Sequence, residues 1–205
     1  MRYQRTIGRF TVVAQCGQDL AAQAEELLNQ LELMNARGPA LHDGTTIQFG
    51  WSLLTLRGND GELYVCEPYF RGDALHEVLP TVDDTLRVLS RQVKLLRTLG
   101  ITGVDVRFNE SLVVAKDCLK EDHIHLVREQ PDRAFTGWYI GRFGEKEEEV
   151  TPDKVMGMNV YEVFNLRYSV LDVLTLPPGY KVSFTGDIIE AVMDADGKVF
   201  RPRIL

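Results

Sequence analysis

The sequence predicts an α+β protein in which antiparallel sheets pack with a few helices. Only a few segments space their apolar residues as helices do, and many short runs are rich in β-branched and aromatic residues. Gly, Pro and Asn-Asp-Gly turns bound these runs. The chain has 205 residues, of which 44% are hydrophobic and 26% are charged, as in globular proteins that bury a core of their own.

The first lobe is expected to cover residues 1–109 and to begin with a strand and a helix. The strand is Phe10 to Ala14, and helical spacing then runs from Leu20 to Met34 until Gly38 and Pro39 end it. A hairpin is expected next, with strand-like runs Thr46–Leu56 and Glu62–Glu67 around an Asn-Asp-Gly turn.

The clearest helix of the sequence follows Pro80 and spans Thr81 to Leu99. Thr81 and Asp84 are placed as a capping box, and Gly100 ends the helix. Its apolar face is predicted to consist of Leu86, Leu89, Val93 and Leu96.

The second lobe is expected to cover residues 110–205 and to hold most of the strands. Its predicted strands are Leu112–Ala115, Ile124–Arg128, Gly137–Arg142, Tyr180–Phe184, and a hairpin of Ile188–Met193 with Lys198–Phe200. Asn159 and Glu162 are placed to cap a short helix that ends near Phe164. Because no flexible linker separates the lobes, we expect them to pack closely together.

Charge and cysteine content restrict the possible partners and the compartment. The net charge of −7 gives no generic attraction for a phosphate backbone, so no direct nucleic-acid partner is expected. The three cysteines, Cys16, Cys66 and Cys118, lie too far apart for a zinc ribbon and are expected to be buried reduced thiols. No apolar run has the length of a signal peptide or a membrane span, so we expect a cytoplasmic protein without membrane association.

The search for catalytic chemistry leaves one weak metal candidate. His123 and His125 would project from the same face of a strand, as two metal ligands do. A third ligand is not evident, so we predict no metal, no cofactor and no catalytic residue. Asp194 and Asp196 resemble the start of a calcium loop, but a hairpin turn is the preferred interpretation because Asp-Gly is a favoured turn pair.

An acidic segment stands out in the second lobe. It comprises Glu145, Glu147, Glu148, Glu149 and Asp153. A solvated loop explains such a run, and so does a surface that complements a basic cleft on a partner protein. The Thr-Pro pair before Asp153 predicts the start of a helix, where that carboxylate meets the positive end of the helix dipole.

The order of motifs in the second lobe resembles a known family. Leu112-Val-Val-Ala-Lys is followed by Thr136-Gly-Trp-Tyr-Ile-Gly, the acidic segment, Val160-Tyr-Glu-Val and Leu176-Pro-Pro-Gly-Tyr. This order is similar to that of the immunity-protein family numbered thirty-three of bacterial polymorphic-toxin systems. The family's hallmark is a Gly-Trp pair in a strand, here Gly137 and Trp138. The stretch from Phe49 to Pro68 and the helix after Pro80 also resemble the N-terminal extension of longer members.

The resemblance implies a non-catalytic antidote that binds and neutralises a secreted toxin in the cytoplasm of the producing cell. The acidic segment is then the expected toxin-facing surface, and Trp138 is expected to be buried near Leu112, Val114, Ile140 and Phe184. Two alternatives remain open. One is a small metal-assisted hydrolase that uses His123 and His125, and the other is an adaptor protein without a toxin partner.

Overall fold

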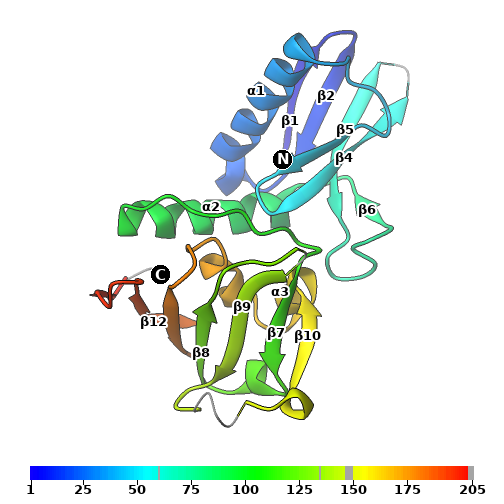
Figure 1. The fold of residues 1–205 in the computed structure, drawn as a ribbon. Helices are drawn as coiled ribbons and strands as arrows, with labels where there is room; N and C mark the ends of the chain where they lie inside the picture. Colours follow the sequence, from blue (N-terminus) through cyan, green and yellow to red (C-terminus); the bar gives the residue numbers. More distant parts are fainter. Residues whose placement is uncertain (60, 134, 146–149, 203–205) are drawn as a thin grey trace. The chain divides into compact units, whose positions relative to one another are not determined.

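The computed structural model describes residues 1–59, 61–133, 135–145 and 150–202. The chain divides into two compact units, Met1–Ser90 and Arg91–Leu205 (Figure 1). Each unit combines one large β-sheet with helices, so the predicted α+β class is confirmed. The boundary expected between residues 109 and 110 lies within the second unit.

The first unit is a sheet with strand order β1-β2-β5-β4-β3. Its strands are β1 (Arg2–Ile7), β2 (Phe10–Gln15), β3 (Thr46–Phe49), β4 (Ser52–Asn59) and β5 (Glu62–Pro68), with a short β6 (Val78–Leu79) beside β5. The β4–β5 hairpin was predicted from its Asn-Asp-Gly turn. The sheet is mixed rather than wholly antiparallel, because β2 pairs with β5 in parallel.

The run predicted as one strand from Thr46 to Leu56 is two strands, β3 and β4, joined by a tight turn. Gly50 makes the turn with a φ of +55°, and its position lies against Leu89, so a side chain there would clash. Trp51 follows it and is buried, with its ring stacked on Phe70 at 4.5 Å between centroids. The sequence pattern missed this turn because the apolar residues continue through it.

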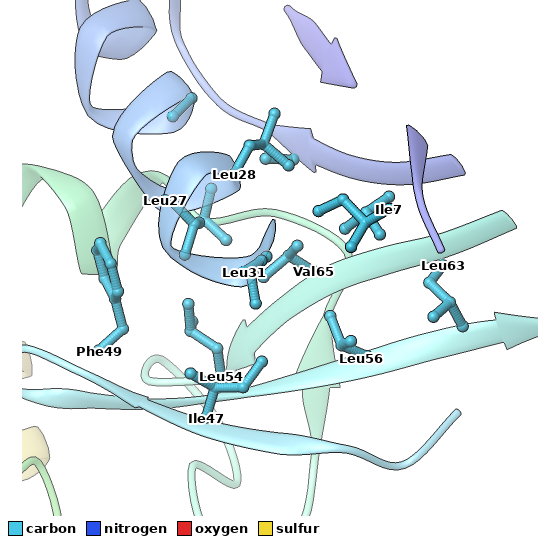
Figure 2. Close-up of a cluster of buried hydrophobic side chains, with 14 of the residues drawn as sticks. Ile7, Leu27, Leu28, Leu31, Ile47, Phe49, Leu54, Leu56, Leu63 and Val65 are labelled. Atoms are coloured by element: carbon cyan, nitrogen blue, oxygen red, sulfur yellow. The ribbon is translucent and has the colours of Figure 1, made fainter. Parts of the chain in front are cut away.

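The core of the first unit lies between its sheet and α1 (Ala21–Arg37), which a short 3-10 turn, η1 (Gln18–Leu20), precedes. Figure 2 shows Leu27, Leu28 and Leu31 of α1 facing strand residues such as Ile7 and Leu56. All five side chains are almost completely buried. In the sequence, the apolar residues of α1 recur with a spacing of about 3.6 residues and those of the strands alternate. This core can therefore be predicted from the spacing of apolar residues.

The second helix, α2 (Asp83–Leu99), begins in the first unit and ends in the second. A buried carboxylate caps its start: Glu67 of β5 accepts hydrogen bonds from the backbone N–H of Asp84 (3.3 Å) and of Thr85 (2.7 Å). The predicted capping box has Thr81 accept a hydrogen bond from the Asp84 backbone N–H. In the structure Glu67, a residue of a strand, accepts this hydrogen bond instead. Thr81 instead accepts from the backbone N–H of Asp83.

The second unit is a sheet with strand order β10-β7-β9-β8-β11-β12-β13. Its strands are β7 (Ser111–Ala115), β8 (His123–Arg128), β9 (Phe135–Arg142), β10 (Val155–Asn159), β11 (Lys181–Thr185), β12 (Ile188–Met193) and β13 (Val199–Phe200). This sheet is also mixed, because β7 and β9 run parallel. Its helices are α3 (Val160–Leu166) and the 3-10 segments η2 (Cys118–Lys120), η4 (Pro152–Lys154) and η5 (Tyr168–Val173).

Several predictions for this unit are confirmed at the level of single contacts. Asn159 and Glu162 form the capping box of α3, in which the Glu162 carboxylate accepts from the Asn159 backbone N–H at 2.7 Å. Asp194 begins a turn between β12 and β13, where its side chain accepts from the backbone N–H of Asp196 and Lys198.

Two features concern the whole chain rather than this unit alone. The cysteines are free and buried, with Cys16 and Cys66 in the first unit and Cys118 in the second. None of the helices in the described residues is both long and apolar enough to cross a membrane.

The two faces of the second sheet differ in burial. Ile124, Leu126 and Arg128 of β8 are buried, as are Trp138 and Ile140 of β9, and these residues define the inner face. The alternate residues of the same strands define the outer face and are half-buried or exposed, apart from Gly141, which is buried. η5 covers the inner face at Trp138, whose indole N–H donates to the Leu174 carbonyl just beyond η5 at 2.8 Å.

Candidate functional site

A groove of about 920 Å³ lies on the outer face of the second sheet. We call it the outer-face groove. Its lining comes from β7, β8, β9 and β11 and from the segments that follow β8 and β9: Ser111, Leu112, Val113, His125, Val127, Glu129, Gln130, Asp132, Phe135, Gly137, Trp138, Tyr139, Glu145, Val150 and Lys181. A groove of this size accommodates several side chains of a partner.

Strand register explains which side chains form the floor of the groove. Val113 of β7 pairs with Tyr139 of β9, Tyr139 with Val127 of β8, and Val127 with Lys181 of β11. Paired residues point to the same side of a sheet, so these four side chains make one row across four strands. Gly157 of β10 pairs with Val113 and extends the row without a side chain.

Gly137 lines the groove beside Tyr139, and we call the part of the groove between Phe135 and Tyr139 the hollow. It lies two residues before Tyr139 on the same strand, so the outer face has no side chain at this position. Its φ is +79°, and a Cβ would lie 2.3 Å from the carbonyl oxygen of Glu129. The register between β7 and β9 shifts here, as at a β-bulge. Only glycine fits this backbone, because a Cβ there would run into the backbone of Glu129 and Gln130.

Trp138 anchors the same segment from the other side of the sheet. Its side chain is 1% exposed, as predicted, and the buried guanidinium of Arg128 lies 5.7 Å from its ring centre. Arg128 donates to the carbonyls of Thr136, Leu174 and Leu176, and burial lowers its pKa to about 10. The Gly-Trp pair therefore fixes a rigid strand whose outer side is open.

Acidic side chains outnumber basic ones around the groove. Glu129, Asp132 and Glu145 contribute carboxylates, and Lys181 contributes an ammonium group. Glu145 accepts a hydrogen bond from the Tyr139 hydroxyl at 2.8 Å. Partial burial and this bond to a carboxylate raise the pKa of Tyr139, so the hydroxyl stays protonated and holds Glu145 in place.

Of the predicted acidic segment, the structure places one residue, Glu145, in the lining of the groove. Glu145 is half-buried, points to Tyr139 and lines the groove, whereas Asp153 is exposed in η4. A hydrogen bond from Thr151 lowers the pKa of Asp153. Thr151 and Pro152 begin a helical turn as expected, although this turn is a single 3-10 turn. Glu147, Glu148 and Glu149 lie outside the described residues.

His123 and His125 lie on the same face of β8, as predicted, and this face is the outer one. The ring nitrogen Nδ1 of each has a protein partner. His125 bonds to the carbonyl of Arg142 at 2.7 Å, and His123 contacts the hydroxyl of Thr185 at 3.2 Å. Among residues 1–59, 61–133, 135–145 and 150–202, no three His, Cys, Asp or Glu side chains gather as a metal site requires.

Sequence reasoning missed most of the groove. Glu129, Asp132 and Phe135 lie outside the quoted motifs, and Tyr139 lies within one but was not singled out as a site residue. The available signal was alternation: Trp138 was expected to be buried, so its neighbours Gly137 and Tyr139 had to face outward. Which of these residues meet across strands depends on register, and register was not predictable from the motifs.

The fold and the groove together define an α+β protein with a groove on one sheet face, lined by more acidic than basic side chains, and with no metal-binding cluster among the described residues. A family model, the Imm33-like domain, matches residues 91–195, just over half of the chain. The chain belongs to the Imm33-like family, which confirms the resemblance found in its motifs. Every groove residue lies within the matched segment. No curated protein and no solved structure matches the chain.

Proposed function

We propose that the protein is a non-catalytic immunity protein that binds and neutralises a cognate secreted toxin in the cytoplasm of the producing cell. The observation that carries the proposal is the Imm33-like match over residues 91–195, which begins at the first residue of the second unit. Membership of the family supports toxin binding in general. That the chain neutralises one cognate toxin is our own proposal.

The outer-face groove supports a binding role in particular. It presents an exposed aromatic side chain, a half-buried tyrosine and several carboxylates on a rigid sheet. Aromatic residues set among polar groups are typical of the energetically important parts of protein interfaces. A metal-assisted hydrolase has less support, because His123 and His125 lack a third ligand among the described residues.

The proposal is tested by capture followed by protection. The tagged full chain is used to capture its partner from the producing bacterium, and that partner is then produced in a susceptible host with and without the chain. We expect growth arrest by the partner alone and normal growth when the chain is co-produced. The controls are an inactivated form of the partner and an unrelated immunity protein.

The two alternatives give different results in the same assay. A captured partner that is not toxic, or whose toxicity the chain does not relieve, contradicts the immunity proposal and favours an adaptor. Hydrolytic turnover by the purified chain that chelation abolishes and a divalent metal restores favours the enzyme.

A further inference from the structure

We propose that the outer-face groove is the docking site for the partner protein, and that an arginine or lysine side chain of that partner enters the hollow above Gly137. This inference rests on the proposed function for the existence of a partner. The position of the site and the chemistry of its occupant come from the groove alone.

The shape of the groove favours one projecting side chain of a protein. The hollow lies where Gly137 removes a side chain from the outer face, between Phe135 and Tyr139 on the same strand. The positive φ and the nearby Glu129 backbone exclude any residue other than glycine at this position, so no side chain of residue 137 occupies the hollow. Around it the sheet face continues over β7, β8 and β11, which gives a broad surface for the protein that carries the side chain.

The walls of the hollow suit the stem of a long cationic side chain. Phe135 is 51% exposed at the rim, and Tyr139 and Val127 form the floor. Arginine and lysine lay their methylene groups on apolar surface while the charged end stays near polar groups. Aromatic faces also attract guanidinium and ammonium groups directly.

The charges of the groove select a cation over an anion. Glu129 and Asp132 are exposed at the rim beside the hollow, and Glu145 is fixed at the other end of the groove by Tyr139. Lys181 is the opposing charge and lies on β11, at the end of the residue row. Three carboxylates against one ammonium group leave the lining negative, so a partner cation is attracted and is directed away from Lys181 toward Glu129 and Asp132.

The first experiment measures the chemistry of the site without any toxin. Three blocked tripeptides, Leu-Arg-Leu, Leu-Gln-Leu and Leu-Glu-Leu, are titrated into the full isotope-labelled chain, and backbone amide shifts are followed by NMR. We expect saturable shifts at Val127, Gly137 and Tyr139 with the Arg peptide, at a Kd on the order of millimolar. The Glu peptide should bind at least about tenfold more weakly. Absence of saturable shifts in the groove, or equal binding of the Arg and Glu peptides, overturns the proposal.

The second experiment locates the charges with matched variants. The double variant Glu129→Lys with Asp132→Lys should weaken the Arg peptide by about tenfold or more. Its control, Asp105→Lys with Asp196→Lys, makes the same change of charge at exposed positions of the same unit outside the groove lining and should stay within about twofold. If the first variant unfolds, Glu129→Gln with Asp132→Asn tests the same carboxylates. Equal effects of the groove and control variants contradict the site.

The same variants are then measured against the inactivated toxin recovered by the protection assay. A loss of affinity confined to the groove variant supports docking in the groove. Protection that persists with unchanged affinity of the groove variant overturns the groove while the proposed function stands. Arg-peptide binding in the groove without any toxin that the chain neutralises overturns the proposed function while the chemistry of the groove stands.

Discussion

Gly137 and Trp138 are adjacent residues with opposite side-chain requirements. Trp138 fills the inner side of β9 and donates a hydrogen bond to the Leu174 carbonyl, so it joins the sheet to the segment after η5. Gly137 must have no side chain, because its positive φ and the nearby carbonyl of Glu129 exclude one. The pair combines a large buried anchor with an open outer surface, and each residue type follows from a different steric condition.

Replacing Trp138 should be strongly destabilising. Trp138→Ala removes a large buried ring and the bond to Leu174, so we expect a loss of about 3–5 kcal/mol in the free energy of unfolding. Phe135→Ala in the same strand is the control, because that ring is 51% exposed, and exposed positions usually change stability by less than about 0.5 kcal/mol. Chemical denaturation measures both variants, and equal midpoints for Trp138→Ala and wild type would show that the ring is not a core anchor.

Gly137→Ala should destabilise the chain although it adds only a methyl group. The new Cβ would need a strained φ of +79° and would lie 2.3 Å from the Glu129 carbonyl oxygen. We expect a loss of more than about 1 kcal/mol. Gly157→Ala is the matched control, because that position has no positive φ and its Cβ would meet nothing within 4 Å; it should be neutral or stabilising by up to about 1 kcal/mol. Urea unfolding that ranks the two variants alike would contradict this account.

At the scale of elements, Glu67 joins a strand to a helix. It comes from β5 and is 2% exposed, and its carboxylate accepts the backbone N–H groups of Asp84 and Thr85 at the start of α2. Burial raises its pKa to about 7, and the nearby Asp84 adds to this effect, while the hydrogen bonds from Thr85 oppose it. The cap therefore titrates near neutral pH, far above an ordinary glutamate.

The stability of the chain should consequently depend on pH through Glu67. Because its pKa is about 7 in the folded state against 4.5 for an ordinary glutamate, the folded state binds more protons than the unfolded state between these pH values. Stability from this group is then fully present below about pH 4.5 and falls as the pH rises toward 7, with a slope of up to about 1.4 kcal/mol per pH unit. Unfolding free energies measured for Glu67→Gln should lack this component, and those for the exposed control Glu77→Gln should keep it. If the free energy of unfolding depends on pH in the same way for Glu67→Gln and Glu77→Gln, Glu67 is not the source of the effect.

Local chemistry accounts for the elements that the sequence predicted. The capping box of α3, the turn at Asp194 and the core face of α1 depend on residues close together in the chain, and all three are confirmed. The buried face of α2 was harder to predict from apolar spacing, because it includes the polar residues Thr85 and Gln92. The cap by Glu67 depends on a residue 17 and 18 positions before the amides it binds. A contact between residues this far apart in the chain cannot be predicted from short-range sequence patterns.

At the scale of the whole molecule, each sheet contains one parallel pair that the sequence did not predict. β2 pairs with β5 and β7 pairs with β9, although other strands lie between them in the sequence. The second of these pairs brings Val113 beside Tyr139 and so builds the floor of the groove. The candidate site was therefore predicted only where it coincides with a motif, at Gly137 and Glu145. The domain boundary near residue 110 remains a prediction.

The acidic segment allows a last test of how the protein meets its partner. Glu145 is held by Tyr139 and lines the groove, so changing it would alter the groove as well as the charge. Glu147, Glu148 and Glu149 offer the cleaner experiment. If this segment faces a basic cleft, reversal of all three to Lys should lower toxin affinity mainly through a slower on-rate. Charge–charge attraction is screened by salt, so the loss should be larger at low than at high ionic strength.

Folding should survive this triple reversal, because the crowding of like charges in the sequence disfavours burial of such a run, and exposed substitutions usually change stability by less than about 0.5 kcal/mol each. The comparison with Glu129→Lys and Asp132→Lys then separates two electrostatic roles. Carboxylates that contact a partner cation slow its dissociation, so their reversal should raise the off-rate and retain an effect at high salt. Charges that only steer the encounter act on association. Stopped-flow binding of the inactivated toxin at two salt concentrations measures both rates. Unchanged affinity of the triple variant at both concentrations would leave residues 147–149 without a binding role.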